Sequence, residues 1–165
     1  MIKIDKKIQI KILKIILIII WMMSIFIFSG QQGTESSSTS RKFTVAIIQI
    51  TTGKSLALDD PFVEGIQLFI RKMAHFTIYA IGGFLIMNYA YTTEKTMKQK
   101  MLYSIAIGGG YAITDELHQF FVSGRSAQIL DVVIDTAGVI IGVLIYLALR
   151  KLIELAINKN NTKVV

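Results

Sequence analysis

Residues 129–149 read ILDVVIDTAGVIIGVLIYLAL, and this stretch determines the class of fold that the sequence predicts. It meets the requirement for a helix that crosses a bilayer, which is about 20 mostly apolar residues. Along such a helix Asp131, Asp135, Gly138 and Gly142 fall within roughly 60° of arc on one face. Acidic side chains are costly in hydrocarbon, so we expect this face to meet other helices instead of lipid.

Three more segments have the same character, at about residues 12–28, 73–91 and 101–122. The composition agrees, because 53% of the 165 residues are apolar and the mean hydropathy is +0.57. The sequence therefore predicts an all-α fold, an integral membrane four-helix transmembrane bundle that forms a single domain over residues 1–165. An extracytoplasmic loop of about residues 29–72 follows the first span. With no cysteine in the chain, disulfide and thiolate chemistry are excluded.

The net charge of +7 is distributed unevenly along the chain. Three regions hold most of the basic residues, namely Lys3, Lys6, Lys7, Lys11 and Lys14 at the start, Lys95, Lys98 and Lys100 in one connection, and Arg150, Lys151, Lys159 and Lys163 in the tail. An even number of spans places these regions on one side, and basic loops stay cytoplasmic. We expect both termini inside, contact of the lysines with anionic lipid head groups, and no nucleic-acid partner.

The first span and the loop after it carry further signals. Large apolar residues stand before Ser29, where a signal-peptide cleavage site needs small ones, so we expect an uncleaved anchor. The Ser-rich stretch 31–40 favours irregular structure. Residues 43–50 are β-prone and predict either a short strand or a segment on the membrane surface. Asp60 before Pro61 is typical of a helix start, and we expect that helix to run into the second span.

Polar residues gather near the predicted outer ends of spans two, three and four. The candidate binding residues are Arg71, Lys72, His75, Tyr79, Asp115, Glu116, His118, Gln119, Arg125, Asp131 and Asp135. Acids and bases nearly balance within this set. Two interpretations follow, and they are compatible: structural ion pairs that lock the helices together, or an outward-facing pocket for the head group of a ligand.

The same residues include metal-ligand types and one candidate acid–base pair. Two histidines on different spans do not form the His-Glu-x-x-His pattern of a zinc enzyme, so we expect no metal and no cofactor. Glu116 and His118 are the candidate catalytic residues of an intramembrane hydrolase. The chain has neither a serine nucleophile elbow nor a phosphate-binding loop, and the sequence favours a binding protein over an enzyme.

Three motifs occur in a specific order: Arg71-Lys72-x-x-His75-Phe76-x-x-Tyr79, then Asp115-Glu116-x-His118-Gln119-x-Phe121-x-x-Gly124-Arg125, then Asp131-x-x-x-Asp135-x-x-Gly138. In this order and spacing the sequence resembles the VanZ family over about residues 20–150. Ser123 stands where we expect many members to carry proline. The resemblance implies a bacterial integral membrane protein with a role in the cell envelope. The family's founding member is associated with low-level resistance to teicoplanin.

These observations lead to one main functional hypothesis and two alternatives. The main one is a multi-pass protein of the bacterial plasma membrane that binds a lipid-linked cell-wall component or a lipoglycopeptide at its outer face. Teicoplanin-type resistance would follow from such binding. The alternatives are an intramembrane enzyme that modifies an envelope lipid and a structural subunit of a membrane complex. The sequence gives no indication of the oligomeric state.

Overall fold

A computed structural model describes residues 5–31 and 33–161, and over these ranges the fold is all-α, as predicted. Its helices are α1 (Lys6–Ser29), α2 (Gly33–Thr52), α3 (Pro61–Ala90), α4 (Met97–Phe120) and α5 (Ile129–Asn161). Lys3, Gln32 and Lys163, which belong to the predicted basic arm, outer loop and tail, lie outside the described residues.

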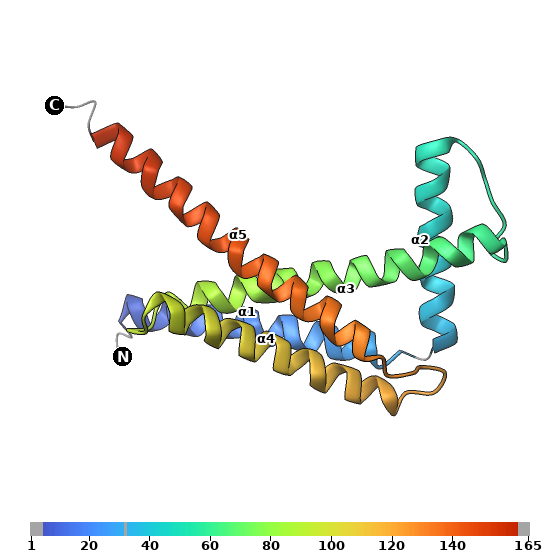
Figure 1. Cartoon of the computed structure of the whole chain (residues 1–165), viewed down its shortest axis with the longest axis horizontal. Helices are drawn as coiled ribbons and strands as arrows, with labels where there is room; N and C mark the ends of the chain where they lie inside the picture. The colour runs from blue at the N-terminus through green and yellow to red at the C-terminus, as the bar shows by residue number, and fades with distance from the viewer. Residues whose placement is uncertain (1–4, 32, 162–165) are drawn as a thin grey trace.

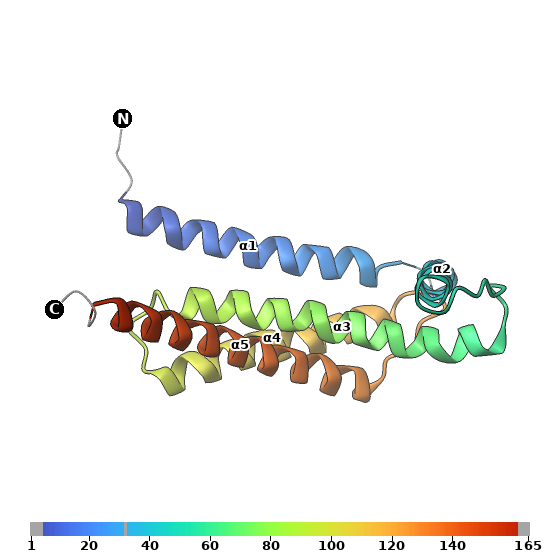
Figure 2. The ribbon, with the colours of Figure 1, turned by 90° about the horizontal axis from the view of Figure 1, so that it is seen from above.

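Helix α3 is the centre of the molecule, because it contacts α1, α2, α4 and α5 (Figure 1). Helices α1 and α4 run alongside it, α5 crosses it obliquely, and α2 lies across one end of the group (Figures 1 and 2). We call the end with α2 and the α4–α5 connection the α2 end. The first turns of α1, the α3–α4 connection and the last turns of α5 form the opposite end.

Helix starts follow the local sequence. Asp60 caps α3 by accepting a hydrogen bond from the Phe62 backbone at 2.8 Å, and Pro61 occupies the first helical position, as predicted. Helix α3 then continues without a break to Ala90, so the helix before the second predicted span and that span form one element. Thr96 and Gln99 form a reciprocal capping box at the start of α4.

Residues 33–52 form helix α2, so the prediction of an irregular Ser-rich stretch is wrong and so is that of a strand at 43–50. The other alternative for residues 43–50, a segment on the membrane surface, stays a prediction. The physical reason is tertiary packing, since α2 lies against α3 and buries Thr44 and Ile48. The hydroxyl groups adapt to the helix by bonding to carbonyls one turn earlier, Ser40 to Ser36 and Thr44 to Ser40, each at 2.9 Å. Ser and Thr hydroxyls that would compete with the helix are thereby satisfied within it.

Small residues allow α5 to pack closely on α3. A Cβ atom on Gly142 would lie 1.8 Å from the Ala80 carbonyl oxygen, and one on Gly83 would lie 2.1 Å from the Val139 carbonyl oxygen. Only glycine fits where two helix backbones approach this closely. Trp21 of α1 is buried and donates to the Ile78 carbonyl at 2.8 Å.

Two of the described helices are long and apolar enough to cross a membrane: α1, and α5 over Ile129–Lys159. Both expose large apolar side chains that no other part of the described chain covers, among them Ile20 and Ile27 on α1 and Leu130 and Ile153 on α5. An apolar helix surface of this kind suits a lipid environment.

Candidate functional site

Three of the predicted site residues come together at the α2 end, each from a different helix. The side chains are those of His75 in α3, Asp115 in α4 and Asp135 in α5. Each has a nitrogen or oxygen atom that could bind a metal ion, and these three atoms lie within 4.8 Å of one another. Asp115 is only 3% exposed and Asp135 only 2%. Packing of α3, α4 and α5 therefore builds a small buried centre with two carboxylates and one imidazole.

Hydrogen bonding at this centre is incomplete. Gln119, one turn after Asp115, donates from Nε2 to Asp115 Oδ2 at 3.1 Å, and His75 Nδ1 lies 3.6 Å from Asp135 Oδ2. The remaining oxygens, Asp115 Oδ1, Asp135 Oδ1 and the hydroxyl of Tyr79, are buried without a hydrogen-bond partner. Buried polar atoms normally have one, and exceptions concentrate at functional sites.

Lys72 and Asp131 form an ion pair between α3 and α5 at the edge of this centre. Their side chains are 31% and 20% exposed, so the pair is partly screened by solvent. A cavity of about 10 Å³, enough for roughly one water molecule, adjoins the pair. Its lining consists of Arg71, Lys72, His75, Gln119, Asp131, Ile134 and Asp135.

The two candidate catalytic residues, Glu116 and His118, are not brought together. Glu116 accepts a hydrogen bond from the Gln128 backbone, directly before α5 begins, and so ties α4 to the start of α5. His118 stacks on the ring of Phe26 in α1, with ring centroids 4.3 Å apart and planes inclined by 20°. The two side chains thus contact different helices, and the geometry does not favour them as one acid–base pair.

A larger pocket of about 320 Å³ lies where α1, α2 and α3 meet the α4–α5 connection. Its walls combine apolar and cationic side chains: Ile25, Phe28, Ser29, Gln31, Ser36, Thr39, Ser40, Phe43, Arg71, Ala74, His75, Ile78 and Arg125. Phe28 and Phe43 are 60% and 64% exposed, so apolar rings stand at its margin. Because His75 also belongs to the buried centre, the two features are adjacent.

Arg125 is held in this pocket by a single hydrogen bond. It donates from a terminal guanidinium nitrogen to the Phe28 carbonyl at 3.2 Å, while its Nε is buried without a partner. Burial and, secondly, the neighbouring guanidinium of Arg71 lower the pKa of Arg125 from its ordinary value. Two guanidinium groups thus share one pocket, an arrangement that favours a bound anion.

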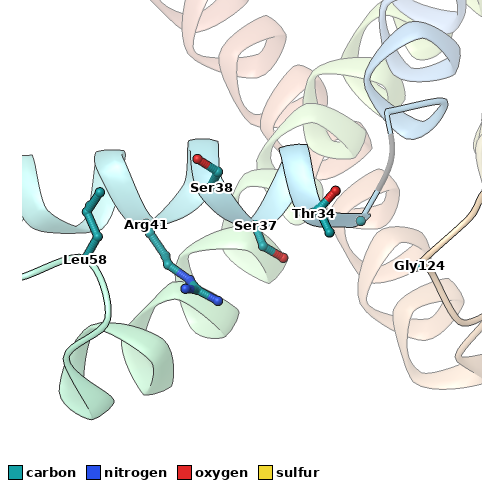
Figure 3. A pocket seen from close by; sticks show the side chains of 7 residues that line it. Thr34, Ser37, Ser38, Arg41, Leu58 and Gly124 are labelled. Atoms are coloured by element: carbon teal, nitrogen blue, oxygen red, sulfur yellow. The ribbon is translucent and has the colours of Figure 1, made fainter.

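Sequence reasoning missed the residues on the other face of α2. A hollow of about 460 Å³ lies there, and Thr34, Ser37, Ser38 and Arg41 of α2 stand along its wall (Figure 3). Arg41 donates to the side chain of the buried Gln67 at 3.1 Å. Helical spacing could have indicated Gln67, which lies one turn before Arg71 and two turns before His75.

The start of α2 is fixed on the α4–α5 connection. Gly33 donates from its backbone to the Ser123 carbonyl at 3.1 Å, and a Cβ atom on Gly33 would lie 2.0 Å from the Gly124 carbonyl oxygen. Gly124 has a φ of 76°, which favours glycine. This contact closes the pocket at the α2 end and keeps Arg125 beside α1.

The described residues form an all-α architecture, and two of its helices are long and apolar enough to cross a membrane, as a helical membrane protein requires. The chain belongs to the VanZ/LLP1 family, whose model matches residues 14–150, and the resemblance found in the sequence motifs is thereby confirmed. No curated protein and no solved structure matches the chain.

Proposed function

We propose that the chain is a multi-pass protein of the bacterial plasma membrane, with α1, α3, α4 and α5 as four spans of one domain over residues 1–165. Helices α1, α3 and α4 run side by side, which supports a common path through the bilayer (Figures 1 and 2). The basic α3–α4 connection lies at the same end as the first turns of α1 and the last turns of α5. Both termini are then cytoplasmic by the positive-inside rule, and the α2 end faces outward.

On this orientation the pocket between α1, α2 and α3 binds the head group of an anionic lipid-linked envelope component. The observation that supports this function is the pairing of Arg71 and Arg125 in one pocket whose other walls include Phe28, Phe43 and Ile78. A phosphate accepts hydrogen bonds from guanidinium groups with good geometry. The volume of about 320 Å³ suits a phosphate with the first carbons of its chain.

The most direct test compares two long-chain lipids that differ only in charge. The purified full chain in detergent micelles should retain a polyprenyl phosphate at least about tenfold better than the neutral polyprenol, because an anion gains the two guanidinium contacts. Arg125→Ala and Arg71→Ala should each remove most of this preference, measured by native mass spectrometry.

Arg41→Ala is the matched control, because Arg41 lies on α2 in the neighbouring hollow and does not line the pocket. It should bind the phosphate lipid like the parent. Equal retention of both lipids by the parent would contradict the proposal. Equal losses in the Arg41 and Arg125 variants would mean that positive charge in general, and not this pocket, holds the lipid.

Low-level teicoplanin-type resistance would follow from the same site. A lipoglycopeptide carries a fatty chain that enters the outer leaflet while its core stays at the surface. Expression in a susceptible Gram-positive host should therefore raise the inhibitory concentration of the lipid-tailed drug more than that of a tailless drug with the same core. Arg125→Ala should weaken this effect at equal membrane abundance. Equal protection against both drugs would contradict a pocket at that depth.

An enzyme that modifies an envelope lipid is the alternative function. Since Glu116 and His118 contact different helices, this alternative would depend on His75 and Asp135, whose side chains face each other at 3.6 Å. If the chain is an enzyme, His75→Gln should abolish turnover of a polyprenyl phosphate or pyrophosphate while binding persists. If the chain is a binding protein, the parent itself should show no turnover.

A further inference from the structure

We infer that His75, Asp115 and Asp135 form a binding site for a divalent metal ion, with Zn²⁺ the best match to the donor set. This site adjoins the lipid pocket and shares His75 with it, but its ligand atoms can hold an ion without any lipid. It also goes against the expectation from the sequence, which counted two histidines on different spans as a weak signal. In the structure one histidine meets two aspartates from two other helices.

The chemical types of the three ligands match those of zinc sites. Zn²⁺ is bound by imidazole nitrogen and carboxylate oxygen, and sites with three protein ligands keep a fourth position open. In a tetrahedral zinc site the ligand atoms lie about 3.3 Å apart. His75 Nδ1 and Asp135 Oδ2 are already 3.6 Å apart, and all three donor atoms lie within 4.8 Å of one another. Small side-chain rotations would bring them to an ion.

Charge is the second consideration. Asp115 and Asp135 are 3% and 2% exposed, and neither forms an ion pair with a lysine or arginine among the described residues, although Arg125 lies within electrostatic reach of Asp115. Lys72 is paired with Asp131, and the imidazole of His75 is the one basic group in direct contact with Asp135 among the described ion pairs. Unpaired carboxylates in an apolar interior are strongly unfavourable. A divalent cation would neutralise both at once.

Buried atoms without a hydrogen-bond partner support the metal site independently of the charges. Asp115 Oδ1 and Asp135 Oδ1 are buried without a hydrogen-bond partner, as is the hydroxyl of Tyr79. Tyr79 is fully buried and lies within electrostatic reach of both carboxylates. A bound ion would satisfy the carboxylate oxygens, and water at its open position would give the tyrosine hydroxyl a partner.

The experiment uses the purified full chain in detergent, stripped with a chelator, and Zn²⁺ alone as the ligand. Equilibrium dialysis with metal analysis should give about one zinc per chain, and zinc should raise the melting temperature of the parent. Asp115→Asn, Asp135→Asn and His75→Gln should each weaken zinc binding by about 100-fold or more. Each variant keeps nearly the shape of the side chain that it replaces.

Two matched controls separate this site from general attraction of cations. Asp131→Asn removes a neighbouring carboxylate that is bonded to Lys72, and His118→Gln removes the other histidine, which stacks on Phe26. Both should bind zinc within about threefold of the parent. If Asp131→Asn or His118→Gln loses as much affinity as Asp135→Asn, the assignment of these three ligands is wrong.

Stability without metal gives a second, independent readout. In the stripped protein Asp115→Asn and Asp135→Asn should melt at or above the temperature of the parent, since each removes a buried carboxylate that no described lysine or arginine pairs with. Zinc should no longer shift their melting temperatures. The proposal does not depend on these variants folding, because failure of the stripped parent to take up zinc, or to melt higher in its presence, would overturn it directly.

Discussion

The two ends of the helix group treat charge in opposite ways. At the end away from α2, cationic groups lie over aromatic rings. The Nζ of Lys100 and the Cζ of Arg150 lie 4.9 and 4.0 Å from the ring centre of Tyr91, and the Nζ of Lys95 lies 5.6 Å from that of Tyr103. Lys14 donates to the Asn88 carbonyl at 2.9 Å. Such contacts leave the charged groups at the surface, where lipid head groups and water complete their solvation.

At the α2 end, charged groups instead point between the helices, and several of their atoms have no partner. Asp115, Asp135 and Arg125 each bury a polar atom without a hydrogen bond. This arrangement costs free energy that the packing of apolar side chains must offset. Among the described residues, the unpartnered buried side-chain atoms lie at the α2 end, and a ligand bound there would relieve the cost of burying them.

The largest expected difference between the two ends is their accessibility to a reagent outside the cell. With no native cysteine in the chain, Ser38→Cys, Lys98→Cys and Lys151→Cys each give one exposed thiol. If the α2 end faces outward, an impermeant thiol reagent should label the cysteine at Ser38 in intact cells. The other two should react only after the membrane is opened.

The labelling pattern can also reverse the orientation. Reaction of the cysteines at Lys98 and Lys151 in intact cells, with none at Ser38, would place the charged centre on the cytoplasmic side. The proposed binding of an outer envelope lipid would then fail, whereas the zinc site would stand, because its evidence does not depend on orientation.

The close packing of α5 on α3 connects the two ends, and its loss should have the largest effect on stability. In Gly142→Ala the new methyl group would meet the Ala80 carbonyl, so the helices must separate, at a cost of about 3 kcal/mol. Gly110→Ala is the matched control, because a Cβ atom there has nothing within 4 Å. Unfolding in mixed micelles should show this difference, and equal stability of both variants would contradict the packing.

Much of this architecture could be predicted from the sequence because apolar periodicity and caps are local signals. The stretch 129–149 predicted the start of α5, and Asp60 before Pro61 predicted the start of α3. Asp131 and Asp135 were correctly expected to face other helices, since a charge facing lipid would be too costly. Gly138 and Gly142, which the sequence places on the same face, lie close against the α3 backbone in the structure.

The rest could not be predicted, for physical reasons that act over long distances. Helix α2 depends on its packing against α3 and on the contact of Gly33 with Gly124, and composition alone favours an irregular segment there. Glu116 and His118 are two residues apart, and only the positions of α1 and α5 show that they contact different helices. The pairing of Arg71 with Arg125 likewise arises from tertiary structure.

A smaller effect should distinguish the ion pairs at the two ends. A double-mutant cycle with Lys72→Met and Asp131→Asn should give a coupling free energy of about 1 kcal/mol, because the pair is only partly exposed. The same cycle on Arg150 and Glu154, whose side chains are 45% and 59% exposed, should give less than about 0.5 kcal/mol. Equal coupling energies would mean that the surroundings of the two pairs do not differ as described.

The smallest expected effect concerns Tyr91, the ring on which Lys100 and Arg150 rest. Tyr91→Leu should lower the free energy of unfolding by about 0.5–1 kcal/mol, since an aliphatic side chain fills space but offers no negative ring face to a cation. Tyr91→Phe keeps the ring and should stay close to the parent. Equal losses in both variants would show that the hydroxyl or the packing, and not the cation–ring contact, stabilises this end. Neither variant should change the affinity for zinc or for polyprenyl phosphate, because both sites lie at the α2 end. A change in either affinity would show that the two ends are energetically coupled through α3 and α5, and that stabilisation and binding are not separated along the molecule.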